Sequence, residues 1–241
     1  MFQINVVNKC KGILRPFTRK AKAQQNSGRC QDIEERAANH YRKAGNHFKM
    51  AKNWSSAGYA FAQSAKYREI PYDSSTDNVE AANCYKKVEP EKAIQCLSKA
   101  AEIQIGNGKY QLAAKYHEEM GKIFEGWKRI EEAIQHYEMA GEYFRSELKN
   151  AAGNRCYLKA AELAATIDEF DKAIKIYEDI APRALESNLL KYSAEDHYFR
   201  AALCHLCVDF LNAHHALTRY SDEYPAFNDS RKGINSKITL L

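Results

Sequence analysis

The sequence predicts an all-α protein made of antiparallel helical hairpins stacked into a solenoid. Only 11 Gly and 5 Pro occur among 241 residues, which leaves few turn residues for a protein of many short strands. The chain is instead rich in Ala, Lys, Glu and Leu, which favour helices. Similar residues also recur at intervals of 40 positions, which is the signature of a repeat architecture.

One repeated series marks the second helix of each hairpin. The pair Ala-Ile begins at Ala93, Ala133 and Ala173, and Ala213 continues the series. Four positions after each Ala stands a bulkier residue: Leu97, Tyr137, Tyr177 and Leu217. Apolar residues four apart share one face of a helix, so we expect this face to pack between helices.

A second series marks the first helix of each hairpin. It consists of small residues, again 40 positions apart: Ala81, Gly121, Ala161 and Ala201. Three positions further on stand Cys84, Phe124, Ala164 and Cys204. Small residues at a fixed place in each repeat predict that a neighbouring helix approaches closely there.

The helices are predicted in pairs. They are 37–48 with 53–66, 79–87 with 90–107, 110–125 with 129–146, 150–167 with 169–185, and 190–209 with 210–224. The short links at 126–128 and 166–168 force neighbouring helices to run antiparallel. The longest internal loop is predicted at 70–78. A period of 40 fits either a longer-helix relative of the tetratricopeptide repeat or a HEAT-like array.

Charge is distributed unevenly along the chain. Residues 1–31 carry seven basic side chains and no acid, although the whole chain has a net charge of only +5. We predict a basic arm (1–30), a helical-repeat domain (31–231) and a short tail (232–241). Such an arm suits an anionic membrane or nucleic acid, or is simply a solvated terminus.

The sequence contains no motif that predicts catalysis. Phosphate-binding glycine loops and the nucleophile elbow of hydrolases are missing, so we expect neither an enzyme nor a cofactor. Cys204, His205 and Cys207, followed by His214 and His215, suggest half of a zinc site. The repeat instead places Cys204 in the core and His214 where Ile134 and Ile174 stand, so we expect packing and no metal. Seven Cys without a disulfide framework favour a reducing, cytoplasmic setting.

Basic residues also follow the repeat. Lys115 and Arg155 are 40 positions apart, as are Lys109 and Lys149. Equivalent positions in successive hairpins share a face of a solenoid, so two basic columns are predicted. Each side chain alone is typical of a solvated surface, but a row of them suits a long acidic helical partner. Tyrosines such as Tyr192 and Tyr198 either anchor a partner at the surface or pack in the core.

Several segments together resemble the alpha- and beta-SNAP family of soluble NSF attachment proteins. They are 48–55 (FKMAKNWS), 85–87 (YKK) with 90–97, 189–194 (LLKYSA) with 201–205, and 225–227 with 229–231. The segments occur in the family's order and spacing across residues 31–231. The resemblance implies a right-handed twisted sheet of antiparallel helices with tetratricopeptide-like repeats.

The resemblance also implies a function and a set of contact residues. Family members wrap SNARE complexes, which are helical bundles of syntaxin and synaptobrevin type, and recruit the NSF ATPase. Residues that match the SNARE-facing set are Lys86, Lys87, Lys109, Lys115, Arg155, Lys159, Leu189 and Tyr192. Lys149 joins them through the repeat spacing. We expect no nucleic-acid partner; the alternative is a helical-repeat scaffold for another helical or peptide partner.

Three departures from the family pattern qualify these expectations. Glu195, the next position after Lys115 and Arg155 in the series, stands where the family usually has Lys. The family's membrane-contacting loop corresponds to a polar stretch at 21–29. Similarity ends near Arg231, so we expect weak or absent stimulation of NSF.

A membrane contact is nevertheless expected from the basic arm. Ile13, Leu14 and Phe17 are predicted to take the place of the family's apolar loop, and basic residues flank them. The longest apolar runs fall short of the roughly 20 residues that span a bilayer. We therefore expect a cytoplasmic protein that associates peripherally with membranes.

Overall fold

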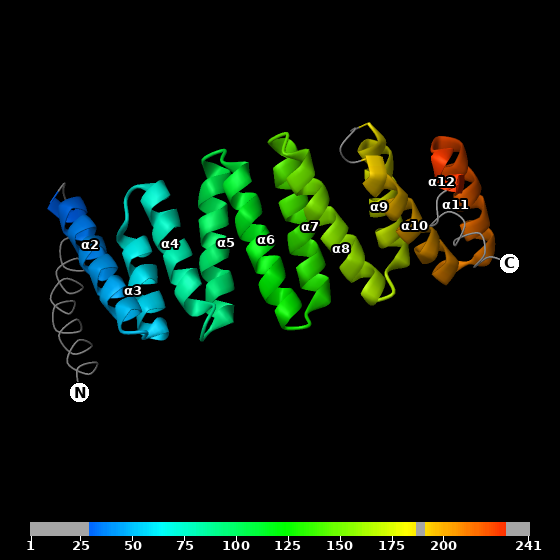
Figure 1. Ribbon diagram of the computed structural model, residues 1–241. Coiled ribbons are helices and arrows are strands. Elements are labelled where there is room, and N and C mark those ends of the chain that lie inside the picture. Colours follow the sequence, from blue (N-terminus) through cyan, green and yellow to red (C-terminus); the bar gives the residue numbers. More distant parts are fainter. Residues whose placement is uncertain (1–28, 187–190, 230–241) are drawn as a thin grey trace. The chain divides into compact units, whose positions relative to one another are not determined.

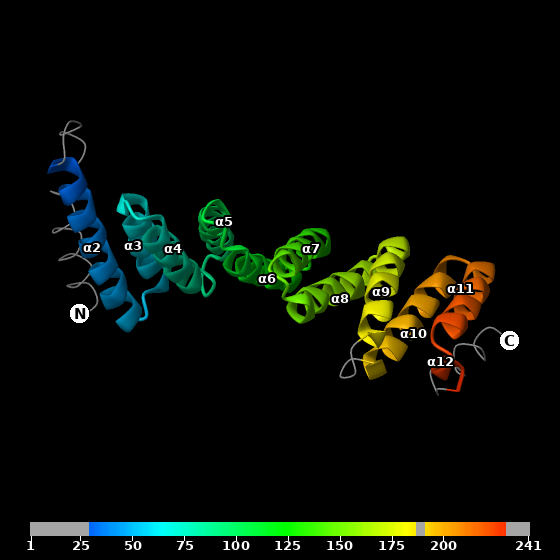
Figure 2. The same cartoon turned by 90° about the horizontal axis from the view of Figure 1, so that it is seen from above.

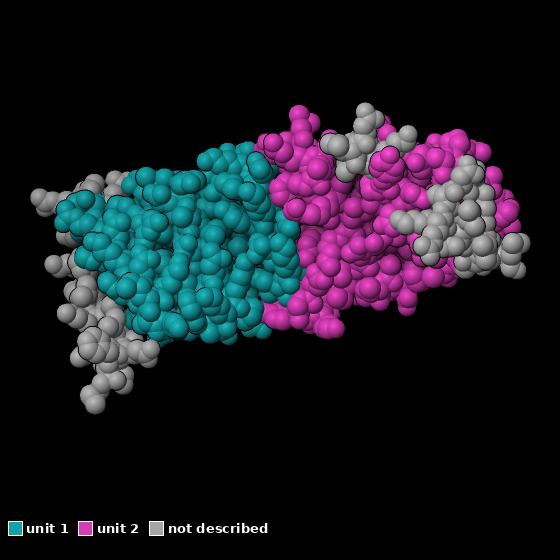
Figure 3. Space-filling view, in the orientation of Figure 1, with its two compact units in different colours: residues 1–123 teal, residues 124–241 magenta. Residues whose placement is uncertain are grey.

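The structure is a computed structural model that describes residues 29–186 and 191–229 of the chain. Across these two ranges every regular element is a helix, which confirms the predicted all-α fold class. The chain divides into two compact units, residues 1–123 and residues 124–241, which Figure 3 shows in different colours.

The first unit contains four complete helices and most of a fifth. They are α2 (Arg29–Met50), α3 (Trp54–Tyr67), α4 (Pro71–Tyr85), α5 (Pro90–Gly106) and α6 (Tyr110–Gly126). Helices α2 to α5 alternate in direction and pack against one another in chain order (Figures 1 and 2). Their apolar faces form one core, in which Phe61, Leu97 and Met120 are buried.

The second unit contains the remaining helices. They are α7 (Ile130–Ser146), α8 (Asn150–Thr166), α9 (Phe170–Leu185), α10 (Lys191–Val208), α11 (Phe210–Glu223) and the short α12 (Ala226–Asp229). Each of the longer helices packs on the next along the chain. Near the end of the unit, the rings of Tyr198 and Tyr220 lie 4.7 Å apart, and Phe227 packs on Tyr198 at 6.0 Å.

The predicted repeat positions form the cores of both units. All eight small residues of the two series are buried, from Ala81 and Ala93 to Ala201 and Ala213. Their bulkier companions are buried as well, including Tyr137 and Tyr177 between helices. The repeat therefore identified the packing faces of helices α4 to α11 correctly.

Two glycines outside those series show how closely the helices approach. A Cβ atom added to Gly58 of α3 would lie 2.8 Å from the ring of Tyr85, and one added to Gly141 of α7 would lie 2.6 Å from the ring of Tyr157. Both distances are shorter than van der Waals contact, so only glycine fits at these two crossings.

The helix ends share a common turn. In five turns of the described chain, a backbone N–H bonds the carbonyl five positions earlier, as from Lys149 to Phe144 at 2.9 Å. The residue before each donor has a positive φ: Lys52, Gly108, Lys128, Leu148 and Asp168. The last four lie 20 positions apart, so the backbone turns repeat at half the 40-residue period.

The predicted loop at 70–78 is wrong, because α4 begins at Pro71. Proline suits the first turn of a helix, where its missing N–H has no intrahelical partner. Three polar residues of this stretch are buried: Ser75, Asp77 and Asn78 are at most 6% exposed. Helix α2 also begins at Arg29, eight positions before the predicted start.

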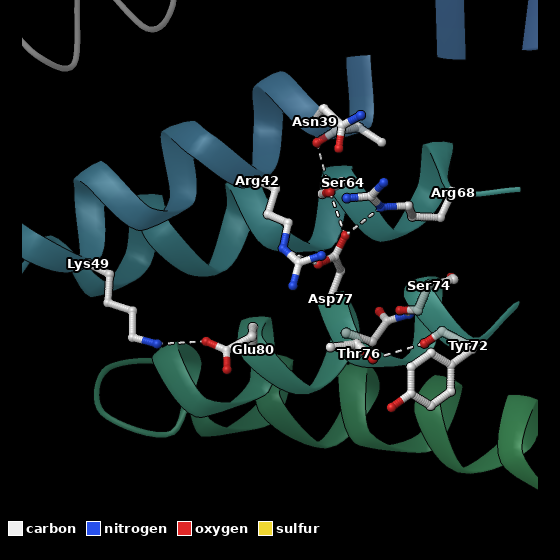
Figure 4. Close-up of polar contacts among 12 residues, drawn as sticks. Asn39, Arg42, Lys49, Ser64, Arg68, Tyr72, Ser74, Thr76, Asp77 and Glu80 are labelled. Carbon is white, nitrogen blue, oxygen red and sulfur yellow. Dashed lines mark hydrogen bonds and ion pairs between the residues drawn. The ribbon is translucent and has the colours of Figure 1, made fainter. Parts of the chain in front are cut away.

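Asp77 is the centre of a buried polar cluster that joins α2, α3 and α4 (Figure 4). Asp77 is fully buried, and its Oδ2 accepts hydrogen bonds from Ser64 at 2.6 Å and from Arg68 Nε at 3.1 Å. The other carboxylate oxygen lies 3.4 Å from Arg42 Nε. Arg68 also contacts Glu35 of α2. The cluster links all three helices through one carboxylate.

Near the end of the chain the structure decides one open alternative and corrects one prediction. Tyr198 is 1% exposed, so of the two roles left open it has the core one. His214 is exposed, although its repeat equivalents Ile134 and Ile174 are buried.

Candidate partner-binding surface

In the first unit, the candidate lysines come from the end of α4 and the start of α6. Lys86 caps the C-terminal end of α4 and Lys87 follows it. Lys109 immediately precedes α6, and Lys115 lies in the second turn of that helix. Lys86 Nζ contacts the carboxylate of Glu119, which lies one helical turn after Lys115 on the same stripe of α6. This contact places Lys86 and Lys115 on one surface.

Two of these lysines are held over aromatic rings. Lys87 Nζ lies 3.3 Å from the centroid of the Trp54 ring, and Lys109 Nζ lies 4.8 Å from that of Tyr72. A cation over a ring face is attracted by the ring quadrupole and keeps its full charge. Both side chains are exposed, so their charges remain accessible to a partner.

Lys86 is in a different situation. Its side chain is 27% exposed and that of Glu119 is 39% exposed, so the pair is partly shielded from water. Lys122 Nζ also lies 3.1 Å from Glu119 Oε1. Burial raises the pKa of Glu119, but the hydrogen bonds from Lys86 and Lys122 outweigh burial, and the net pKa is lowered. Glu119 is therefore an ion-paired carboxylate at the edge of this surface and not a freely solvated one.

In the second unit, the candidate residues come from α8 and α10. Lys149 is the N-cap residue of α8 and is exposed, as is Arg155 in the second turn. Lys159 is one turn beyond Arg155 on the same stripe, and its Nζ lies 2.8 Å from Glu125 Oε1. Arg155 and Lys159 are thus brought together on one face of α8.

At the start of α10, Tyr192 is 80% exposed, which suits a partner-contacting side chain. Glu195 follows it by three positions and is partly buried. Leu189 lies outside the described residues, as do Ile13, Leu14 and Phe17. The basic columns that pair Lys109 with Lys149, and Lys115 with Arg155, each join residues of different units and stay predictions.

Large apolar side chains near these residues were not predicted. Ile70 and Tyr72 at the start of α4 are 57% and 53% exposed, and Leu148 beside Lys149 is 85% exposed. Leu148 also has a φ of +58°, where Gly108 stands in the equivalent turn. The left-handed backbone conformation costs energy for a residue with a Cβ atom, and the exposed leucine side chain makes little packing contact that could offset this cost. The 20-residue turn spacing is the signal that would have identified this position.

The cysteine and histidine residues near the end of α10 do not converge. Cys204 is buried, and burial raises its pKa to about 11, whereas Cys207 is exposed. His205 Nε2 lies 3.0 Å from Glu178 Oε1. Among the described residues, no group of three or more His, Cys, Asp or Glu is arranged to hold a metal ion. Within the same ranges, no helix combines the length and apolarity needed to cross a bilayer.

These features define a helical-repeat protein with basic and aromatic side chains exposed on and beside its even-numbered helices. The sequence model described as "Soluble NSF attachment protein, SNAP" matches residues 18–234. The chain belongs to the soluble NSF attachment protein family.

Individual relatives agree with this family. The chain is 45% identical to human alpha-soluble NSF attachment protein over 202 residues, which are 82% of this chain and 68% of the relative. It is 46% identical to the bovine beta protein over the same shares of each chain. It is 34% identical to the vesicular-fusion protein SEC17 of Komagataella phaffii, over 82% of this chain and 69% of that protein.

Two solved structures are also similar to this chain. The TPR-like repeats of a putative kinesin light chain from Podosopora anserina match with a TM-score of 0.49 and 12% identity, over 81% of this chain and 96% of that chain. BtubC from P. vanneervenii matches with a TM-score of 0.46 and 14% identity, over 94% and 92%.

Proposed function

We propose that this protein is an adaptor that binds SNARE complexes during vesicle traffic and membrane fusion, without catalysing a reaction itself. The proposal is supported by membership of the attachment-protein family and by the vesicular-fusion role that the name of the SEC17 relative states. The observation that carries it is the exposure of Lys115 on α6 and Arg155 on α8, at equivalent positions of the repeat.

The proposed mechanism is electrostatic docking of an acidic helical bundle. Lys87, Lys109 and Lys115 in the first unit offer cations to such a surface, as do Lys149 and Arg155 in the second. Charges at a rim mainly speed association and fix the orientation of the partner. Tyr192 supplies a large amphipathic contact, which is the type of side chain found at interface hot spots.

The test is charge reversal followed by binding to an assembled SNARE bundle of syntaxin and synaptobrevin type. The double variant Lys115→Glu/Arg155→Glu is expected to bind about tenfold more weakly or worse. Each reversal replaces an attraction of up to ~1 kcal/mol with a comparable repulsion, and 1.4 kcal/mol is a factor of ten. Wild-type binding is expected to weaken as salt rises from 0.05 to 0.3 M. Over roughly this range the Debye screening length falls below about 10 Å.

Matched controls separate the surface from net charge. Lys66 of α3 and Lys175 of α9 are exposed lysines outside the proposed set, so Lys66→Glu/Lys175→Glu changes the net charge equally. This control is expected to bind like wild type, and far-ultraviolet circular dichroism should show intact helices in both variants. Equal binding by the reversed and wild-type proteins would favour a scaffold for another helical or peptide partner.

Two further contacts belong to the same proposal. Peripheral membrane contact is assigned to Ile13, Leu14 and Phe17, and co-sedimentation with anionic vesicles should fall when all three are replaced by serine. Contact with the NSF ATPase is measured separately, as the stimulation of ATP hydrolysis by this protein with SNARE complex present.

A further inference from the structure

Two lysines of the proposed SNARE-binding set are already paired within the protein. Lys86 is bound to Glu119, and Lys159 is bound to Glu125 at 2.8 Å. We propose that Glu119 and Glu125 are internal competitors that occupy these two lysines and thereby limit the affinity of the surface for an acidic partner. This inference rests on the proposed function and adds two residues that control it.

Both carboxylates are fixed in place by a second contact. Glu119 is also bound by Lys122 at 3.1 Å. Glu125 accepts a hydrogen bond through its other oxygen from the hydroxyl of Tyr137 at 3.0 Å, and the ring of Tyr137 is buried. A carboxylate held on both sides does not swing away when a partner arrives, so it competes with the partner for the lysine.

The same bridge is present twice, with its charges exchanged. Glu119 and Lys159 occupy the same place in the 40-residue repeat, on α6 and α8 respectively. Each side chain reaches back to the end of the preceding even-numbered helix, to Lys86 after α4 and to Glu125 in the last turn of α6. Lys86 and Glu125 are 39 positions apart, one short of the period, so the equivalence is exact only at Glu119 and Lys159. Both bridges nevertheless join the same stripe of one even-numbered helix to the end of the preceding one.

Other lysines of the proposed set lack such a competitor. Lys115 and Lys149 are exposed, and in the described part of the chain no carboxylate lies within ion-pair distance of either. A partner carboxylate adds an ion pair at Lys115, but at Lys86 it only replaces one that exists. The paired lysines therefore add little to the affinity and little to its salt dependence.

Glutamine variants test this directly, because they keep the shape of the side chain and remove its charge. Glu119→Gln and Glu125→Gln are each expected to tighten binding of the assembled syntaxin–synaptobrevin-type bundle by about two- to fivefold at low salt. The salt dependence of binding should also become steeper, because an unpaired lysine has gained counterions to release. Fluorescence anisotropy with labelled bundle measures both quantities.

A double-mutant cycle separates competition from a general change in charge. In a Lys86→Gln background, Glu119→Gln should no longer tighten binding, and the same should hold for Glu125→Gln in a Lys159→Gln background. Glu102→Gln and Glu142→Gln are the matched controls, since both carboxylates are exposed and outside these bridges. A gain that persists without the lysine, or that both controls reproduce, overturns the inference.

Failure of the inference and failure of the proposed function give different results. Wild-type protein that does not bind the SNARE bundle overturns both. Wild-type protein that binds while the two glutamine variants bind no more tightly overturns the inference alone. The rate of lysine acetylation gives a readout without any partner. In the wild type, Lys86 should react more slowly than Lys115, and Lys86 should react faster in the Glu119→Gln variant than in the wild type. Equal rates for Lys86 in the wild type and the variant would contradict the bridge.

Discussion

Replacing Asp77 by alanine is expected to destabilise the first unit by about 3 kcal/mol. The carboxylate is fully buried and is the shared acceptor for side chains from α2 and α3 (Figure 4). Removing it leaves the guanidinium of Arg68, whose side chain is only 5% exposed, without its buried partner. Breaking a buried pair from one side costs more than the pair contributes, because a charge is left uncompensated.

The magnitude follows from the separate contacts. The hydrogen bond from Ser64 at 2.6 Å contributes about 1 kcal/mol, and that from Arg68 at 3.1 Å, being charged, contributes about 2 kcal/mol. Arg42 is 40% exposed and 3.4 Å away, so its contribution is under about 1 kcal/mol. Arg68 keeps its contact with Glu35, which places the total near the lower end of the range for broken buried pairs.

Urea unfolding followed by circular dichroism measures the change, and a thermal scan should show a midpoint lowered by about 6–12 °C for a chain of this size. Glu80→Gln is the control, because it breaks only the Lys49–Glu80 ion pair, whose side chains are 45% and 33% exposed. That variant is expected to lose less than about 1 kcal/mol. If Asp77→Ala is no less stable than the control, the buried cluster does not hold these helices together.

Three further predictions follow from single side chains. Leu148→Gly should raise stability by up to about 1 kcal/mol in urea unfolding, because φ is +58° and the leucine is 85% exposed; a loss of stability would mean that the side chain packs in the fold. Iodoacetamide at pH 7.5 should modify exposed Cys207 but not Cys204, whose pKa burial raises to about 11; mass spectrometry of the peptides decides. Burial lowers the pKa of His136 below its ordinary 6.5, so the unfolded chain takes up the proton first and stability should fall as pH drops below about 6.5. His136→Gln should reduce that loss, and an identical pH profile would contradict it.

The core residues of both units could be predicted from the sequence because packing between helices restricts the volume of the side chain at each core position. Positions such as Ala133 and Ala173 admit only a small side chain, and Tyr137 and Tyr177 must fill the space that remains between helices. That constraint recurs at every hairpin, so it is visible as a period in the residues alone. Helix boundaries from α5 to α11 were accordingly predicted to within a residue or two.

Helix α4 was mispredicted because its sequence contradicts its environment. Polar residues are usually exposed, so the stretch that contains Ser74 and Ser75 suggested a loop. Burial of Asp77 is possible only because Ser64 and Arg68 reach it from α3, and these partners are 13 and 9 positions away in the chain. No local pattern of residues reveals such a match.

The ion pairs of the candidate site escaped prediction for a related reason. Lys86 and Glu119 are 33 positions apart and meet only because α4 and α6 bring them together. An ion pair between two helices forms equally well with the lysine on the first helix or on the second. The repeat therefore indicates where such a pair can form, but not which helix carries the lysine. The sequence therefore showed the positions of the basic residues but not which of them are already neutralised.

The two bridges carry their lysine at opposite ends, yet both units present the same net charge near the bridge. The clusters to compare are Lys86, Lys115 and Glu119 in the first unit, and Glu125, Arg155 and Lys159 in the second. Exchanging the ends of the bridge leaves each cluster with the same formal charge of one positive unit. Replacing Lys115 or Arg155 by glutamate changes the formal charge of its cluster by two units, from one positive to one negative unit. Because both clusters begin from the same charge, the two reversals should weaken an acidic partner equally, and unequal losses would show that contacts other than charge dominate one of them.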